Sequence, residues 1–187
     1  MGLDRDEVVA LSEEYGGDWG INHTRRLLRL IAIIGDGTDY DEEAVWLAAH
    51  LHDWGGYAAW AEPGVDHAER SAAVAEDLMA ERGVPDERRR LVLEAIRTHH
   101  VGGAGRSLEA SLLSDADALD FLGVVGVLRM FSMAPRDLAA ACAKARRRRD
   151  ELPRSLCLQA SRDLAVARLA EMDRLLAGFE EQTFGLY

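Results

Sequence analysis

Residues 48–56 form the stretch Ala-Ala-His-Leu-His-Asp-Trp-Gly-Gly, in which a helical apolar pattern ends in a histidine–aspartate pair and two glycines. Acidic residues at 41–43 suit the N-terminus of this helix. Adjacent residues inside a helix point about 100° apart, because one turn takes about 3.6 residues. In the last turn before Gly55 the backbone can bend, so one metal ion could receive both His52 and Asp53. His50 lies roughly on the opposite face and is excluded.

The helical period recurs along the rest of the chain, and no segment shows convincing alternation with a period of two. Glycines and prolines mark the breaks, with Gly123 and Gly126 interrupting one helix and Pro153 separating the last two. The pattern predicts helices at 21–34, 41–54, 66–82, 86–100, 108–133, 136–150 and 155–179, with a short one at 6–14. We therefore expect an all-α fold, one helical bundle over residues 1–187, with a core at about 20–135 and C-terminal helices at about 136–182.

The formal net charge of −11 restricts the partners of this protein. A strongly acidic protein repels polyanions, which argues against long nucleic acid as a ligand. A small anionic substrate can still bind where a metal ion and a few arginines make the electrostatic potential positive locally. The N-terminal residues are acidic without an apolar signal region, and no apolar run is long enough to span a bilayer. We expect a cytoplasmic protein without a membrane segment. An oligomer stays possible.

Histidine placement points to a metal site. All six histidines lie in the first 100 residues, and five are at or near predicted helix ends. His23 opens an apolar helix, and Asp117 shares a helix face with Leu113 and Phe121, so its carboxylate should point toward the core. A carboxylate there is costly unless a cation or another partner neutralises it. Imidazole and carboxylate are common ligands of first-row divalent ions.

These residues carry a resemblance to a known family. In order and approximate spacing, His23, His52-Asp53 and Asp117 resemble the H…HD…D signature of the HD-domain phosphohydrolase superfamily. Three further segments are similar to those of small stand-alone bacterial members: H-x-x-R at 23–26, D-A-D-x-L-D-x-x-G at 115–123 and G-x-x-R-x-F at 126–131. The likeness covers roughly residues 20–182 and implies a helical bundle of the HD-domain type.

The resemblance also implies chemistry. It makes His23, His52, Asp53 and Asp117 ligands of a divalent ion, for which manganese, iron, cobalt, nickel or magnesium suits the donor set better than structural zinc. The implied activity is hydrolysis of phosphate esters or anhydrides by a metal-activated water, with a nucleotide as the first substrate to test. Within the D-A-D segment, Asp115 is expected to face solvent or an arginine. Asp120 is expected to orient a ligand or a water.

Two further histidines have more than one interpretation. In some HD-domain proteins histidines in the corresponding elements bind a second metal, and in others they lie beside the substrate. His67 and His99 are therefore candidates for catalysis or substrate contact, for a second metal, or for a structural role. His100 adjoins His99 and is expected to point elsewhere. Arg26 and Arg129 match arginines of the family segments and could bind phosphate or pair with Asp120.

The sequence departs from the family in one respect. Relatives that hydrolyse guanosine tetraphosphate carry an acidic residue shortly after the HD pair, whereas Trp54-Gly55-Gly56-Tyr57 follows here, which leaves the general base unassigned. Two alternatives stay open, a di-iron oxygenase acting on a small polyol or phosphonate and a non-catalytic regulatory bundle. The basic run at 146–149 is interpreted as a solvated helix end, with a phosphate-binding patch as the alternative.

Overall fold

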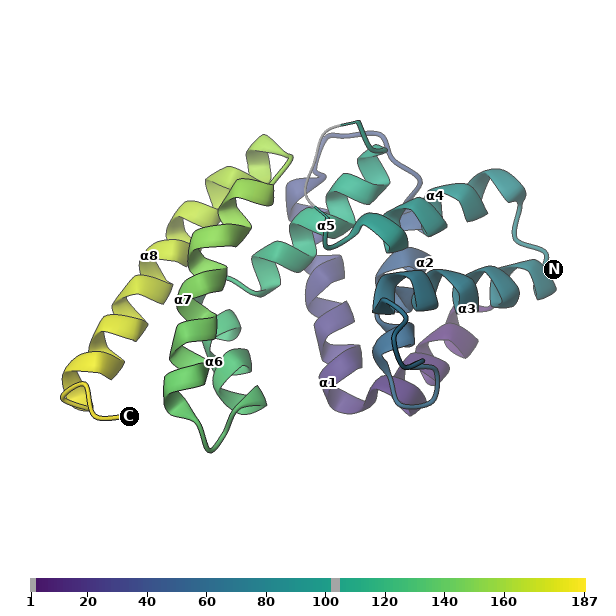
Figure 1. Cartoon of the computed structure of the whole chain (residues 1–187). Helices are drawn as coiled ribbons and strands as arrows, with labels where there is room; N and C mark the ends of the chain where they lie inside the picture. Colours follow the sequence, from purple (N-terminus) through teal and green to yellow (C-terminus); the bar gives the residue numbers. More distant parts are fainter. Residues whose placement is uncertain (1–2, 102–104) are drawn as a thin grey trace.

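The computed structural model describes residues 3–101 and 105–187. Over these residues the chain forms eight α-helices, one short 3-10 helix and no strand, so the predicted all-α fold is confirmed. The elements in chain order (Figure 1) are α1 (Arg5–Ile34), α2 (Glu42–Leu51), η1 (Trp54–Gly56), α3 (His67–Glu81), α4 (Asp86–Thr98), α5 (Leu108–Asp120), α6 (Gly123–Met133), α7 (Leu138–Ser155) and α8 (Gln159–Gln182). None of the helices in the described ranges combines the length and apolar character that a bilayer span needs.

Short polar side chains set the starts of five helices. Each accepts a hydrogen bond from a backbone N–H in the first turn of the helix that follows, an interaction that contributes about 1 kcal/mol. These N-cap residues are Asp4, Asp41, Asp66, Ser107 and Asp137. The predicted helices at 6–14 and 21–34 join in α1 across a kink at Gly17, where φ is 56°. Only glycine adopts this left-handed backbone without strain.

Two helix boundaries differ from the sequence prediction. Residues 108–133 divide into α5 and α6, because the chain leaves the helix at Phe121 and Leu122 and Gly123 has a φ of 75°. Pro153 does not separate the last two helices, since α7 continues through it to Ser155. A proline in the last turn removes one backbone donor where the helix is about to end, so its cost is small there.

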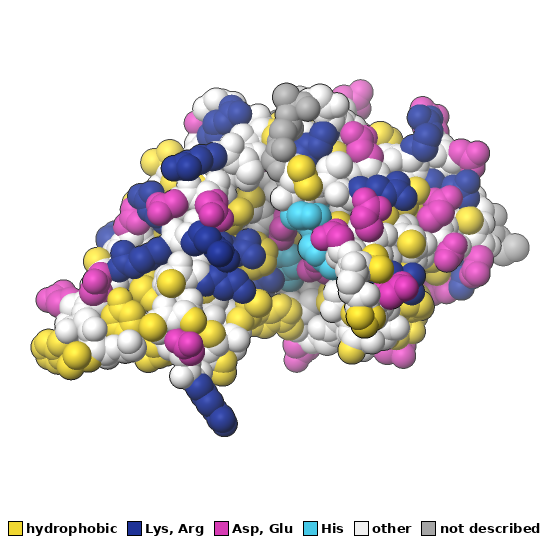
Figure 2. All heavy atoms as spheres, in the orientation of Figure 1, with side chains coloured by type: hydrophobic (Ala, Val, Ile, Leu, Met, Phe, Trp, Pro, Cys, Tyr) yellow, Lys and Arg dark blue, Asp and Glu magenta, His cyan; other side chains and the backbone are white. Residues whose placement is uncertain are grey.

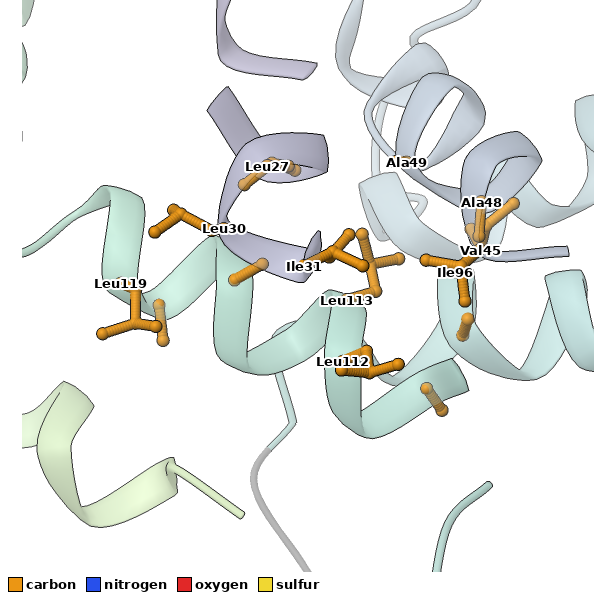
Figure 3. Close-up of a cluster of buried hydrophobic side chains, with 14 of the residues drawn as sticks. Leu27, Leu30, Ile31, Val45, Ala48, Ala49, Ile96, Leu112, Leu113 and Leu119 are labelled. Carbon is orange, nitrogen blue, oxygen red and sulfur yellow. The ribbon is translucent and has the colours of Figure 1, made fainter. Parts of the chain in front are cut away.

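The core surrounds α5, which packs against α1, α2, α4, α7 and α8. In Figure 3, leucines of α5 meet side chains of α1 and α4. These side chains are at most 4% exposed: Leu27, Leu30 and Ile31 of α1, Ile96 of α4, and Leu112, Leu113 and Leu119 of α5. Each contributes about 1.5–3 kcal/mol by its burial. This packing fixes the position of α5 relative to α1, and hence of Asp117 relative to His23.

The C-terminal helices α6, α7 and α8 pack on one another and on α5 (Figure 1). The turn between α7 and α8 covers Asp115, which is fully buried. Its carboxylate accepts hydrogen bonds from the backbone N–H groups of Cys157 and Leu158, each at 2.8 Å. The expectation that Asp115 faces solvent or an arginine is therefore wrong, because this face of α5 lies under the C-terminal helices.

Gly55 allows η1 to lie directly against α3. A Cβ atom at this position would overlap the backbone carbonyl of His67 and the backbone nitrogen of Ser71. We expect Gly55→Ala to lower the free energy of unfolding by about 1–3 kcal/mol, because neither backbone atom can rotate away. Urea unfolding measures this difference. Gly56→Ala is the matched control, since its Cβ would meet only the His67 Cβ at 3.9 Å. Equal losses for both variants would contradict the prediction.

Candidate metal centre

Four side chains from distant parts of the chain converge beside α5. His23 comes from α1, His52 and Asp53 follow α2, and Asp117 lies in α5. The His23 Nε2 atom is 3.2 Å from Asp117 Oδ1 and 3.9 Å from Asp53 Oδ2. The His52 Nε2 atom is 3.3 Å from Asp53 Oδ2. The structure thus brings all four predicted metal ligands together.

The end of α2 explains how adjacent residues reach the same point. His52 still has helical φ and ψ angles, whereas Asp53 has a φ of −102° and a ψ of 0° and begins the turn into η1. This change of backbone direction removes the angular separation that two neighbours have within a helix. His50 remains in α2 with its Nδ1 against the Trp46 carbonyl oxygen at 2.9 Å, away from the cluster.

The imidazoles of the cluster are oriented as metal ligands are. His52 Nδ1 lies 3.0 Å from the Ala49 carbonyl oxygen, which can only accept, so Nδ1 carries a hydrogen and Nε2 is the atom left to bind a metal ion or a second proton. That Nε2 atom is buried and has no hydrogen-bond partner in the described part of the chain. His23 is held in the same way, with Nδ1 2.8 Å from Asp120 Oδ2. Each Nε2 atom faces a carboxylate, an arrangement that a proton on the ring or a metal ion between the two groups stabilises, and a divalent ion fits this donor set.

The charges of the cluster also favour a cation. Burial opposes ionisation of Asp53, but the imidazoles of His52 and His23 outweigh burial and hold the pKa of Asp53 well below its usual range. The pKa of Asp117 is likewise lowered against burial, chiefly by His23. Burial opposes a charge on His52, yet the neighbouring carboxylates raise its pKa to about 9. Two ionised carboxylates beside buried imidazoles therefore attract a proton or a metal ion.

Asp120 fixes His23 and two arginines. Besides its contact with His23, its carboxylate accepts hydrogen bonds from Arg26 Nε at 2.6 Å and Arg26 Nη2 at 2.9 Å, and from Arg129 Nη1 at 2.5 Å. Of the two roles expected for Arg26 and Arg129, the structure shows the ion pair with Asp120. The Nε atom of Arg129 is buried and has no hydrogen-bond partner among the described residues.

A second group of histidines lies next to the first. The His67 and His99 Nε2 atoms are 3.2 Å apart, and the His52 and His99 ring centroids are 5.0 Å apart. His100, expected to point elsewhere, joins this group, with its ring centroid 5.1 Å from that of His67. The three rings present nitrogens within 4.8 Å of one another. His100 was missed because α4 ends at Thr98, so His99 and His100 are no longer on different faces of a helix.

Tyr57 is a residue of the site that the sequence did not single out. Burial and the nearby Asp53 carboxylate both raise the pKa of its hydroxyl well above the usual range. The side chain reaches α1 where Gly16 and Gly20 leave space, because a Cβ at either position would overlap the Tyr57 hydroxyl region. Its place four residues after Asp53 of the HD pair is the signal that could have indicated it.

An open hollow gives access to the site. Figure 2 shows histidine side chains in a hollow between the C-terminal helices and the rest of the molecule, with basic side chains on one side of it. Next to the cluster, a pocket of about 560 Å³ is lined by Asp18, Trp19, Asn22, Arg26, Val125, Leu128, Arg129 and Ser132. Its volume lies in the range of small-molecule sites. The arrangement can therefore bind a metal ion beside a ligand of moderate size.

A helical bundle in which a histidine, a histidine–aspartate pair and a further aspartate, in this order along the chain, converge on one point is typical of HD-type metal sites. The family model of the HD domain matches residues 20–122, more than half of the chain, and the chain belongs to this family. HD domains bind divalent metals, and the two side-chain groups described above could hold one here. A search of the curated proteins found no match.

Several solved structures share the fold. A predicted HD superfamily hydrolase from an uncultured Thermotogales bacterium is 26% identical, with a TM-score of 0.70, and the match covers 95% of this chain and 92% of that one. Bacillus subtilis YpgQ in complex with ADP is 23% identical, with a TM-score of 0.72 and coverage of 95% and 93%. An HD-superfamily hydrolase from Bacillus thuringiensis is 19% identical, with a TM-score of 0.73 and coverage of 97% of both chains. Family and fold support a metal-dependent hydrolase in general terms.

Proposed function

We propose that this protein hydrolyses phosphate esters or anhydrides, and that nucleotides are its main substrates. The observation that carries the proposal is the convergence of His23, His52, Asp53 and Asp117, with the Nδ1 atom of each imidazole anchored and its Nε2 atom facing a carboxylate of the cluster. A bound divalent ion would supply a water of lowered pKa and an electrophile for the phosphoryl oxygen. Manganese, iron, cobalt, nickel and magnesium all suit these ligands.

The residues around the ligands have distinct roles in this proposal. Burial, reinforced by His52, lowers the pKa of His99 to about 4, so its imidazole is neutral at pH 7. His99 Nδ1 is 2.7 Å from the Ile96 carbonyl oxygen, which leaves Nε2 with a lone pair toward His67. His67 is half-exposed, so solvent or a ligand can contact its imidazole. We assign His67 and His99 to proton movement or substrate contact beside the cluster.

The pocket beside the cluster favours a nucleotide. Trp19 is 49% exposed and offers an aromatic face, over which the Arg129 Cζ atom lies at 5.1 Å from the ring centroid. A nucleobase can stack on such a face while Arg26 and Arg129 add positive charge near the phosphates. The ADP complex of YpgQ supports this choice, because it shows that a protein of this fold binds a nucleotide.

One observation favours a second candidate. Asp53 lies between the two histidine groups, with Oδ2 near His52 and Oδ1 3.9 Å from His67 Nε2. A carboxylate in this position could join two metal ions, one in each group. A di-iron oxygenase acting on a small polyol or phosphonate would use such a pair.

Metal analysis followed by a substrate panel tests the proposal. Purified protein is analysed for metal content and then assayed with Mn²⁺, Fe²⁺, Co²⁺, Ni²⁺ or Mg²⁺ against nucleoside mono-, di- and triphosphates. We expect release of phosphate or pyrophosphate with at least one metal, and loss of that activity on chelation. No release across the panel would overturn the proposal. Two irons per chain with oxygen consumption would favour the oxygenase instead.

A further inference from the structure

The basic run at 146–149 contains one member that differs from the others. Three of these arginines form exposed ion pairs with acidic residues of α7 or α8: Arg146 with Glu180, Arg147 with Glu151 and Arg149 with Asp173. Arg148 is half-buried, and within residues 3–101 and 105–187 it has no hydrogen bond or ion pair. The solvated-end interpretation therefore describes three arginines of the run and leaves Arg148 unexplained.

Arg148 points toward the metal-ligand cluster by way of Phe121. Its Cζ atom lies 4.1 Å from the centroid of the Phe121 ring, and the Arg129 Cζ atom lies at the same distance from that ring. The Phe121 and His23 ring centroids are 6.0 Å apart. In Figure 2, basic side chains border the hollow that contains the histidines. The turn between α5 and α6 thus holds an arginine of α7 beside the cluster.

Arg148 carries its positive charge without an ion pair to any carboxylate in the described ranges of the chain. Burial lowers the pKa of Arg148, and the Asp117 carboxylate acts in the opposite direction. A guanidinium stays protonated in such a place, and stacking on an aromatic ring keeps it oriented without using its N–H donors. Arg26 and Arg129 already donate to Asp120, whereas the donors of Arg148 have no acceptor among the described side chains and backbone groups. A partly desolvated cation with free donors is suited to an anionic ligand.

We propose that Arg148 is a substrate-binding residue that contacts a second, linked phosphate, so that the site prefers di- and triphosphates to monophosphates. This inference rests on the proposed function. Asp53 and Asp117 contribute two negative charges that a divalent ion balances, and Arg26 and Arg129 share the single carboxylate of Asp120, so they offer positive charge to a first phosphate. A further phosphate then needs another cationic group. Arg148 lies on the Phe121 ring and makes no hydrogen bond or ion pair with the four metal-ligand candidates in the described part of the chain. When one phosphate binds at the imidazoles, Arg148 can therefore bind the next phosphate of the same ligand.

Binding of a matched ligand pair to the metal-loaded protein tests this inference. Calorimetry compares the nonhydrolysable α,β-methylene analogue of ADP with AMP, which differs by one phosphate. We expect Arg148→Gln to weaken binding of the diphosphate analogue roughly ten- to a hundredfold, because a charged hydrogen bond is lost, and to change AMP binding less than about twofold. Arg147→Gln is the control, since it removes the same charge from an exposed position of the same helix. Metal content and the thermal unfolding midpoint should stay at wild-type values in both variants.

The possible results separate this inference from the proposed function. Equal affinity of wild type and Arg148→Gln for the diphosphate analogue overturns the role of Arg148, even if the wild-type protein hydrolyses nucleotides. An equal loss for AMP and the diphosphate analogue also overturns it, because Arg148 would then act on the first phosphate. A wild-type protein that hydrolyses no nucleotide and binds neither ligand overturns both proposals. Rescue of diphosphate binding by Arg148→Lys, relative to the glutamine variant, would support a charge-based contact.

Discussion

His52→Ala is expected to lose bound metal and at least about a thousandfold in the rate of any metal-dependent hydrolysis. The variant removes the buried Nε2 atom that lies 3.3 Å from Asp53 Oδ2 and has no hydrogen bond among the described residues. A metal ion contributes several kcal/mol to transition-state stabilisation, and each 1.36 kcal/mol is about tenfold in rate. Metal content by mass spectrometry and kcat/KM for the best substrate of the panel measure the two losses.

His50→Ala is the matched control for this experiment. Both histidines are buried and both hold a backbone carbonyl oxygen through Nδ1, but only His52 faces the cluster. Each variant leaves a cavity of similar size, so we expect similar losses of stability. Only the His52 variant should lose metal. Retention of metal and activity in His52→Ala would contradict the assignment, and it would favour the interpretation of a non-catalytic bundle.

Asp120→Ala is expected to have the largest effect on stability, about 3–5 kcal/mol. The carboxylate is 1% exposed and accepts hydrogen bonds from Arg26 and Arg129, so its removal leaves a buried arginine without its counter-charge. It also releases His23 Nδ1, for which we expect metal affinity to fall about 10–100-fold. Urea unfolding and metal titration measure the two effects independently.

An exposed pair of the same chemistry provides the control for Asp120. Asp173 accepts two hydrogen bonds from Arg149, each at 2.8 Å, but both side chains are partly exposed to solvent, the arginine by 39% and the aspartate by 49%. We expect Asp173→Ala to cost less than about 1 kcal/mol, because solvent screens this pair and replaces its hydrogen bonds. Similar unfolding midpoints for the two alanine variants would show that burial does not govern the contribution of Asp120.

The local pattern of the sequence determined the helices and the identity of the ligand candidates. Apolar periodicity, acidic N-caps and glycine breaks are properties of contiguous residues, so the helices at 66–82 and 86–100 could be predicted within a few residues of α3 and α4. The inward direction of Asp117 followed from its neighbours on the same helix face. The spacing of His23, His52, Asp53 and Asp117 indicated the family, which the HD-domain match confirms.

Helix ends were the first point at which the sequence was insufficient. His100 joins the second histidine group because the chain has already left α4, although the same reasoning at the end of α2 correctly united His52 with Asp53. Pro153 remains inside α7 for a related reason. It lies in the last turn of the helix, which ends at Ser155, so the missing backbone donor costs little there. Boundaries depend on the balance of a few backbone hydrogen bonds, which tertiary contacts readily shift.

Helical phase by itself fixed how side chains lie relative to one another on a single helix, and it did so correctly for Asp115 and Asp117. Which of those faces becomes buried was decided only by tertiary structure, because α7 and α8 cover one side of α5 and turn Asp115 into a buried acceptor. The same packing sets Arg148 on Phe121 while its neighbours remain in solvent. Burial and charge pairing arise between segments far apart in the chain, and no local pattern contains that information.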